Sequence, residues 1–367
     1  MAIAEAQHNT ADSSLPERFT RLRTEKLGNV RATFSPVVYA RSNLRAYSIL
    51  AFDAAFFIAA IAGVALSTAP ALKLFFGVLA GVAVSALFVW AHDAAHGALF
   101  GFTRQAELVG TIAMLPSLNM YRMWMYGHNK AHHGFTSFTP IDWIWRPKTP
   151  AEYHNGSRWS RLVYRIERSL LGCALHYILR VWWPGMVAFR PDREIRRKHH
   201  FAYSQMWVAT YLAVATTLAW VFAGGLLGVV AAVIVPWVVF NYHIALFVFL
   251  HHTHPDLPMF DKRAEWSAPI GQVACSTMIR MSPPMEFLMH GILIHTPHHV
   301  DTRIPFYRLR QAFADLQPTF GEDILEYRFR WSTVRSIFGA CQLYDFDTHT
   351  WYRFDNAPTL PLPHDKH

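Results

Sequence analysis

The sequence predicts an integral membrane protein of helical fold class, on three observations: a shortage of charged residues, four long apolar runs, and an uneven distribution of cations. Charged residues make up 16% of the 367 positions, whereas hydrophobic residues make up 52%. A soluble protein carries about 25% charged residues, because its whole exterior meets water. A large part of this chain's surface is therefore expected to meet lipid.

Four apolar runs are long enough to cross a bilayer core, which takes about 20 helical residues. They lie at about 47–67, 72–91, 203–222 and 226–250. Only Ala69-Pro70 breaks the first pair, and only Ala223-Gly224-Gly225 separates the second. The fold class is therefore predicted as all-α, with four transmembrane helices in two hairpins. Pro236 is expected to kink the fourth helix, which neighbouring helices can tolerate.

The loop charges predict the orientation of these helices. The two tight turns carry no charge, and apart from Lys73 the cations lie in the N-terminal segment, in 92–202 and in 251–367. Cytoplasmic loops of membrane proteins keep the cations. We therefore expect a multi-pass protein of the cell inner membrane with both termini and the central region cytoplasmic. A further apolar stretch at 106–118 is too short to span and is expected in or along the interface.

Composition also excludes some classes of protein. The net charge of +9 could indicate nucleic-acid binding, but the basic stretches flank strongly apolar segments, so no nucleic-acid partner is expected. Cys173, Cys275 and Cys341 are too few and too scattered for a disulfide framework or a zinc ribbon. The N-terminus lacks the apolar core of a cleavable signal peptide.

Eleven of the 21 histidines gather in four clusters that all fall on the predicted cytoplasmic side. The first cluster, HDAAH, closes the second apolar run, and its spacing places both rings on one helical face. The fourth span ends in HHTH, and Pro297 of the last cluster places that cluster near the first turn of a helix. The clustered histidines are His92, His96, His128, His132, His133, His251, His252, His254, His295, His298 and His299.

A single histidine pair on a helix is more often structural than metal-binding, because a backbone carbonyl can satisfy a buried imidazole. Four clusters at one membrane depth are harder to explain without a transition metal such as iron, zinc or copper. Zinc sites need only three or four ligands. At least nine imidazoles are present here, which is enough for two metal ions.

The three motifs HDAAH, HNKAHH and HTPHH resemble the histidine boxes of the membrane fatty acid desaturases. HHTHPDLP, Glu265-Trp266 and the sequence IPFY after the last box resemble the Δ12-type branch, and GHNKAHHGFTSF resembles its bacterial members. The resemblance covers roughly residues 45–330. It implies four transmembrane helices under a cytosolic helical cap formed by 92–202 and 251–330.

The resemblance also implies a di-iron centre that uses O₂ as oxidant. Its ligands would be His92, His96, His128, His132, His133, His252, His295, His298 and His299. His251 would then stand outside the metal ligands, and His254 is a weaker candidate. The chain divides into a basic cytosolic segment (1–45), the membrane desaturase domain (46–330) and a cytosolic C-terminal tail (331–367).

One position departs from the family pattern. An asparagine is expected one helical turn before the ninth histidine, where this chain has Val248, and Asn241 lies about three turns deeper. Asp93 is expected to orient an imidazole by contacting the ring nitrogen that does not face the metal. Solvation of the helix end is the alternative explanation for a carboxylate at this position. The aromatic residues Trp124, Trp143, Trp145 and Phe249 are candidates to line an acyl tunnel. His176 and His349 lie outside the clusters and are expected to tolerate alanine.

The predicted function is O₂-dependent, Δ12-like desaturation of a fatty acyl lipid, with electrons from a separate donor such as ferredoxin and its reductase. Related histidine-box enzymes hydroxylate or ketolate lipids and carotenoids, or decarboxylate fatty acids to terminal alkenes, and box spacing does not separate these reactions. A haem-binding membrane electron carrier would need isolated histidines within the spans, where only His243 lies deep. A metal transporter would need polar residues at the midplane of several helices, and Asp53 and Asn241 are too few.

Overall fold

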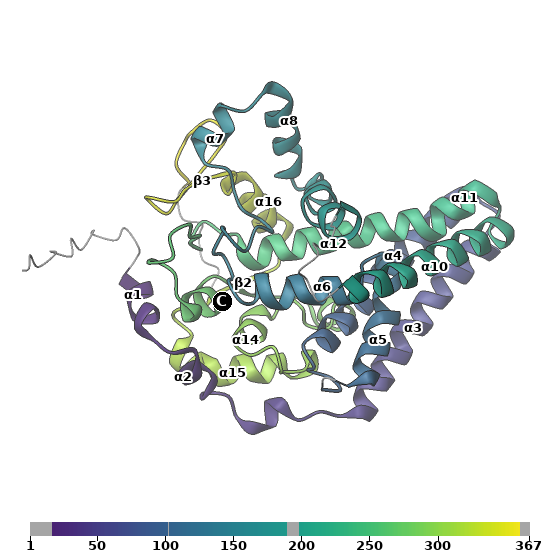
Figure 1. Cartoon of the computed structure of the whole chain (residues 1–367), viewed down its shortest axis with the longest axis horizontal. Coiled ribbons are helices and arrows are strands. Elements are labelled where there is room, and N and C mark those ends of the chain that lie inside the picture. The colour runs from purple at the N-terminus through teal and green to yellow at the C-terminus, as the bar shows by residue number, and fades with distance from the viewer. Residues whose placement is uncertain (1–16, 102, 189–197, 360–367) are drawn as a thin grey trace, which may run out of the picture.

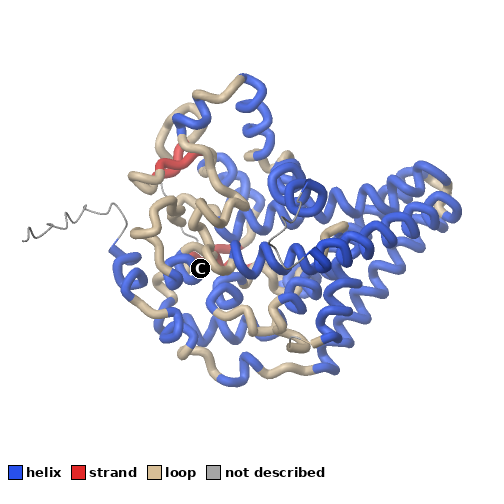
Figure 2. The backbone as a smooth tube through the Cα atoms, in the orientation of Figure 1, coloured by secondary structure: helices blue, strands red, loops and turns tan. Residues whose placement is uncertain are grey.

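The computed structural model describes residues 17–101, 103–188 and 198–359, which are mostly helical. Figure 1 shows long helices extending together to one side of the molecule, and shorter helices and loops gathered at the other. We call this second part the cap. The few short strands all lie within the cap, as the red segments of Figure 2 show.

Four helices are long and apolar enough to cross a membrane, as the sequence predicted. They are Asn43–Leu66, Pro70–Ala95, Phe201–Phe222 and Gly225–His252. The corresponding elements are α3 (Asn43–Leu66), α4 (Pro70–Ala95), α10 (Lys198–Phe222), and the consecutive α11 (Gly225–Val229), η5 (Val230–Ile234) and α12 (Val235–His252). Every predicted end lies within four residues of the observed one.

Local chemistry explains where these helices begin and bend. Ser42 caps α3 by accepting from the backbone N–H of Arg45, and Pro70 lies in the first turn of α4, where its missing N–H costs nothing. Gly224, between α10 and α11, has φ of +90°, which glycine adopts without strain. Near Pro236, where a kink was expected, the helix contains the π-helical segment η5, which ends two residues before that proline.

Two buried charged side chains in the long helices have partners. Lys73 donates to the carbonyl oxygens of Val64 (2.9 Å) and Ala223 (2.8 Å), so it joins the ends of α3 and α10 to the start of α4. Asp53 accepts from the indole of Trp90 at 2.7 Å and lies 2.7 Å from Nε2 of His290. These contacts explain how charged residues are accommodated in otherwise apolar helices.

The cap is built from three parts of the chain. The segment after α4 forms α5 (Arg104–Met114), η2 (Leu115–Ser117), α6 (Tyr121–Gly127), η3 (His128–His132), α7 (Pro150–His154), α8 (Arg158–Glu167), α9 (Cys173–His176) and η4 (Tyr177–Ala188). The segment after α12 forms η6 (Ile270–Ala274), β1 (Thr277–Arg280), α13 (Pro283–Leu288), α14 (His295–Val300), η7 (Phe306–Arg308), α15 (Leu309–Phe320), β2 (Leu325–Arg328), α16 (Trp331–Ala340), β3 (Leu343–Asp345) and β4 (Thr350–Tyr352).

Two small sheets correct the all-α prediction. β1 and β2 pair in parallel, from Thr277 opposite Leu325 to Arg280 opposite Arg328. β3 and β4 form an antiparallel pair. Strands of three or four residues hold too few positions for an alternating pattern to stand out in a sequence.

The third part of the cap is N-terminal: α1 (Glu17–Thr24), α2 (Leu27–Arg31) and η1 (Pro36–Tyr39). Arg31 donates to the carbonyl of Val300 at 2.8 Å, and Arg41 donates to that of Ala98 at 3.0 Å. Apolar side chains of this segment, such as Val30, are buried against the rest of the cap. Residues 1–16 of the predicted cytosolic N-terminal segment lie outside the described residues.

The C-terminal segment also differs from the expected tail. Ile337, Tyr344 and Trp351 are buried, and the hydroxyl of Tyr344 accepts from the backbone N–H of Met259 at 2.9 Å. Residues 331–359 therefore belong to the cap and share its hydrophobic core.

Candidate metal centre

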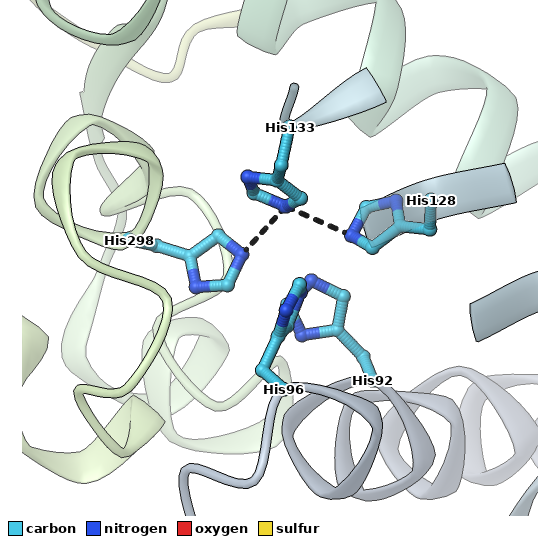
Figure 3. Close-up of side chains that lie close together, drawn as sticks. All are labelled: His92, His96, His128, His133 and His298. Carbon is cyan, nitrogen blue, oxygen red and sulfur yellow. Dashed lines mark hydrogen bonds between the residues drawn. The ribbon is translucent and has the colours of Figure 1, made fainter. Parts of the chain in front are cut away.

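The nine histidines singled out from the sequence come together in two groups. In each group, one nitrogen per ring lies within 4.8 Å of one nitrogen of every other ring. The five-histidine cluster, drawn in Figure 3, consists of His92, His96, His128, His133 and His298. The four-histidine cluster consists of His132, His252, His295 and His299.

The end of α4 positions the first two rings. His92 lies in the last turn of the helix and His96 is the residue that closes it. Their four-residue spacing brings the ring centroids to 4.8 Å. This arrangement agrees with the shared helical face predicted from HDAAH.

The HNKAHH motif divides between the two clusters in a way that its sequence did not predict. In an α-helix His128 and His132 would share a face, but residues 128–132 form the π-helix η3. A π-helix aligns residues five apart, so Nε2 of His128 lies 3.0 Å from Nε2 of His133. His132 instead belongs to the four-histidine cluster.

The single helix α14 serves both clusters. His298 directs Nε2 toward Nε2 of His133, at 3.2 Å (Figure 3). One turn apart on the same helix, His295 and His299 bring their Nε2 atoms to 2.8 Å in the four-histidine cluster. His252, at the end of α12, completes that cluster with its Nε2 atom 3.1 Å from that of His295.

Asp93 orients one ring of the five-histidine cluster. Its Oδ1 atom lies 2.9 Å from Nδ1 of His92, and its Oδ2 atom accepts from the backbone N–H of Phe306 at 2.7 Å. A carboxylate on Nδ1 fixes the tautomer so that Nε2 is free to face a metal. The contact is the one expected of Asp93 from the sequence.

Three rings of the four-histidine cluster are held in the same way. Nδ1 of His132 lies 3.1 Å from Asp142, Nδ1 of His252 lies 2.9 Å from the carbonyl oxygen of Cys275, and Nδ1 of His299 lies 2.9 Å from Oε1 of Gln272. Sequence reasoning missed these outer contacts. A carboxylate ten residues after His132 and an amide 27 residues before His299 have no characteristic spacing.

Burial keeps most of these imidazoles neutral. Loss of solvent, reinforced by the neighbouring rings, holds the pKa of most of them well below the ordinary value of histidine. A neutral imidazole offers a lone pair, which is the form that binds a metal. The effect applies to His96, His128, His133, His295, His298 and His299.

The residues present fit a metal ion in each cluster. Among the described residues, the buried Nε2 atom of His96 has no hydrogen-bond partner, and an unsatisfied buried polar atom is costly. Several Nε2 atoms also converge on one another within 3.2 Å. Imidazole-only donor sets suit iron, zinc or copper.

The other candidate histidines lie outside both clusters. His251 stacks on His295 with ring centroids 3.6 Å apart, and Nδ1 of His254 lies 3.2 Å from Asp256. Val248 borders the cavity described below, and Asn241 donates to the carbonyl of Trp237 at 2.7 Å. Neither therefore brings an amide to the clusters.

A cavity of about 520 Å³ adjoins both clusters. It lies between α4, α6, η4 and α12, has mostly apolar walls, and is bordered by His92 and His128 of one cluster and His132 and His295 of the other. Its size is in the range of small-molecule sites. Trp124 and Trp143 line it as expected.

The expected tunnel residues Trp145 and Phe249 do not border this cavity. They pack edge to face against each other, with ring centroids 4.8 Å apart, and Trp145 stacks on His176 at 3.8 Å. Nε2 of His176 lies 2.5 Å from the carbonyl oxygen of Ile144. His176 therefore supports the backbone that carries the cavity wall, and a neutral response to alanine is no longer expected.

Helices that can cross a membrane, joined to clustered neutral imidazoles beside an apolar cavity, define a class of membrane-associated proteins with a histidine-rich candidate metal centre. Comparison with known proteins narrows this class. The family described as fatty acid desaturase matches residues 66–331. The chain therefore belongs to the fatty acid desaturase family, as its histidine boxes indicated, and it is a desaturase-type oxidoreductase.

The relatives include proteins from cyanobacteria and plants. The sn-1 oleoyl-lipid 12-desaturase of Picosynechococcus is 29% identical over 93% of this chain and 95% of its own. The protein of the same name from Anabaena variabilis is 29% identical over 74% of this chain and 76% of its own. The chloroplastic omega-6 fatty acid desaturase of Brassica napus is 30% identical over 72% of this chain and 58% of its own.

Proposed function

We propose that this protein introduces a Δ12-like double bond into a fatty acyl lipid, with O₂ as oxidant and two iron ions as cofactor. One observation carries the proposal: both histidine clusters border the same apolar cavity. A chain of methylenes in that cavity would lie beside both metal positions. The names of the relatives, oleoyl-lipid 12-desaturase and omega-6 desaturase, support the fatty acyl substrate and the position of the bond.

The two clusters would each hold one iron. Five imidazoles serve the first metal and four serve the second, and the family is generally iron-dependent. The ligands that we propose are His92, His96, His128, His133 and His298 for the first, and His132, His252, His295 and His299 for the second.

The reaction that this site would support balances as follows. Two adjacent methylenes each lose one hydrogen, and with two electrons and two protons these hydrogens reduce O₂ to two molecules of water. When bound, the irons supply the oxidising power that no amino-acid side chain provides for an unactivated C–H bond. The chain's own residues orient the ligands through Asp93 and Asp142, and the cavity walls hold the acyl chain and exclude bulk water.

The membrane arrangement is also part of the proposal. We place α3 with α4, and α10 with the helix from α11 to α12, as two hairpins in the cell inner membrane, with the cap and both termini cytoplasmic. The uncharged turns and the cations of the cap support this orientation. The exposed cations would also suit an acidic electron donor such as ferredoxin, supplied with electrons by its reductase.

The proposal is tested by expression in a host with a simple fatty acid profile, together with ferredoxin and its reductase, followed by mass spectrometry of the lipids. A new double bond at the twelfth carbon of an oleoyl chain is expected. A hydroxylated chain or a terminal alkene would show that the protein catalyses hydroxylation or decarboxylation and not desaturation. An unchanged profile with the donor present and iron bound would contradict the acyl substrate.

A further inference from the structure

The helix α8 buries a polar face in the cap. Tyr164, Glu167 and the following Arg168 are almost completely buried. At about 100° per residue they occupy one arc of the helix. Glu167 pairs with Arg180 at 2.9 Å, and Arg168 donates to the carbonyl of Trp145 at 2.7 Å. Polar partners within the cap therefore fix the orientation of α8.

The opposite face of α8 is apolar and exposed. Trp159, Leu162 and Ile166 are 72%, 48% and 41% exposed, and they fall within an arc of about 60°. We call these three residues the apolar stripe. A helix on a water-facing surface carries polar residues on its outer face. In α8 the arrangement is reversed, because its outer face is apolar and its polar residues are buried. Contiguous exposed apolar groups mark an interaction surface.

The edge of the apolar stripe is cationic. Arg158 is exposed and lies about 40° from Leu162 around the helix. Among the described residues it has no hydrogen-bond or ion-pair partner. The one acidic side chain of α8, Glu167, is buried on the other face. The exposed face of α8 therefore presents the apolar stripe with the unpaired guanidinium of Arg158 at its edge, and it carries no carboxylate.

Exposed apolar residues continue from α8 toward the long helices. Leu171 is 88% exposed, and Leu179 and Trp183 are also exposed. Leu171 lies just before α9, and Leu179 and Trp183 lie on η4. The segment formed by α9 and η4 packs against α12 and borders the cavity. In Figure 1, α7, β3 and α16 lie on one side of α8, and the long helices extend toward the other.

We propose that α8 is an interfacial membrane helix, with the apolar stripe inserted among the lipids beside the spans and Arg158 directed to anionic lipid headgroups. The inference rests on the proposed membrane arrangement and extends it to the cap. Tryptophan favours the bilayer interface, and amphipathic helices with basic edges lie in that plane. A docked protein would leave the exposed continuation at Leu171 and Trp183 unexplained, so lipid is the favoured partner.

The test uses the full-length protein in nanodiscs of phosphatidylcholine and phosphatidylglycerol, with a spin label at Leu162→Cys. The three native cysteines are buried, so background labelling is low. Collisions of the label with O₂, which partitions into lipid, are compared with those of a water-soluble nickel complex. Leu212→Cys on α10 serves as the span control, and Ser332→Cys on α16 as the water-exposed control.

The label at 162 is expected to favour collisions with O₂, as the label at 212 does, whereas the label at 332 favours nickel. A label at 162 that behaves as the one at 332 would overturn the proposal. Shielding of position 162 only after ferredoxin is added would overturn it in favour of donor docking. Nickel access at 212 would instead refute the membrane arrangement itself, and none of these readouts depends on desaturase activity.

The cationic edge is tested separately. In discs containing phosphatidylglycerol, Arg158→Gln should lower the ratio of lipid-immersed to water-exposed label at 162 about fivefold, as expected for one cation near an anionic surface. Arg335→Gln, which removes an exposed charge from α16, should leave the ratio unchanged. If the ratio is the same in Arg158→Gln as in the labelled protein that retains Arg158, the proposed contact between Arg158 and anionic headgroups is wrong.

Discussion

The two histidine clusters differ in how firmly the protein holds their rings. In the four-histidine cluster, Asp142, the carbonyl of Cys275 and Gln272 each contact an Nδ1 atom. In the five-histidine cluster, Asp93 is the one carboxylate among the described residues that contacts a ring. Two of the five rings are also partly exposed, whereas all four rings of the other cluster are buried.

This difference indicates that the two clusters stabilise a metal in different ways: one has more outer contacts to its rings, and the other has one more ligand. Outer contacts orient a ring before the metal arrives, so fewer ligands suffice where they are present. The five-histidine cluster instead relies on an additional imidazole. We therefore expect the metal of the five-histidine cluster to exchange faster and to be lost first to a chelator.

The largest effects should come from removing a ligand. His298→Ala in the five-histidine cluster and His132→Ala in the four-histidine cluster should each abolish desaturation, because the reaction needs both metals beside one cavity. Fatty acid analysis of expressing cells measures the loss, and membrane fractionation shows that insertion is retained. His154→Ala, at an exposed histidine, is the matched control, and full activity in either cluster variant would contradict the ligand assignment.

Removing an outer carboxylate should have a smaller effect. Asp93→Asn and Asp142→Asn keep the shape of the side chain but weaken its hold on His92 or His132, and such changes lower metal affinity about 10–100-fold. The loss should be greater for Asp93→Asn, because the other rings of its cluster have fewer outer contacts. Iron retention against a graded chelator measures it, with the exposed Asp355→Asn as control. Equal retention in both variants would remove the distinction between the clusters.

His176→Ala tests whether the contacts of His176 on α9 stabilise the cavity wall at Ile144. The variant loses a buried hydrogen bond to Ile144 and a ring stacked on Trp145, so we expect a loss of about 1–3 kcal/mol in stability. Thermal unfolding in detergent measures this loss. Iron content should be nearly unchanged, because His176 touches neither cluster, and a large loss of iron would show that the wall and the ligands move together.

The same variant has a predicted pH dependence, which is the smallest effect. Burial lowers the pKa of His176 to about 3, whereas an unfolded histidine titrates near 6.5. Below pH 6.5 the unfolded chain therefore binds a proton that the folded chain refuses, and the stability contributed by the neutral ring is lost as the pH falls. The penalty of His176→Ala should shrink by about 1 kcal/mol between pH 7.5 and 5.5. A constant penalty would show that the ring has the same pKa in the folded chain as in the unfolded chain.

Much of this molecule was predictable from its sequence, because its strongest signals are local. Apolar runs of membrane length and histidines spaced by one helical turn each need only a few consecutive residues to be recognised. The four candidate spans and the four histidine clusters follow from them, whereas the choice of nine histidines within the clusters came from the resemblance to the desaturases. The apolar stripe of α8 is also a local pattern, but it was not recognised because its three residues alternate with arginines in a basic stretch of the sequence.

What the sequence did not predict depends on contacts between distant segments or on small departures from α-helical geometry. His132 belongs to a different cluster from His128 and His133 because residues 128–132 form a π-helical turn. Nothing in the amino-acid composition of this segment distinguishes a π-helix from an α-helix. Gln272 and Cys275 reach His299 and His252 only after the chain has folded. The inclusion of residues 331–359 in the cap depends on buried side chains such as Trp351, whose partners lie elsewhere in the chain.

The central claim is that each cluster holds one iron, and metal analysis of the purified protein tests it most directly. Elemental analysis and Mössbauer spectroscopy of iron-57 protein should find two irons per chain in distinct nitrogen environments, with His298→Ala and His132→Ala each losing a different one of the two spectral components. A single component, a stoichiometric metal other than iron, or the same component lost in both variants would contradict the account.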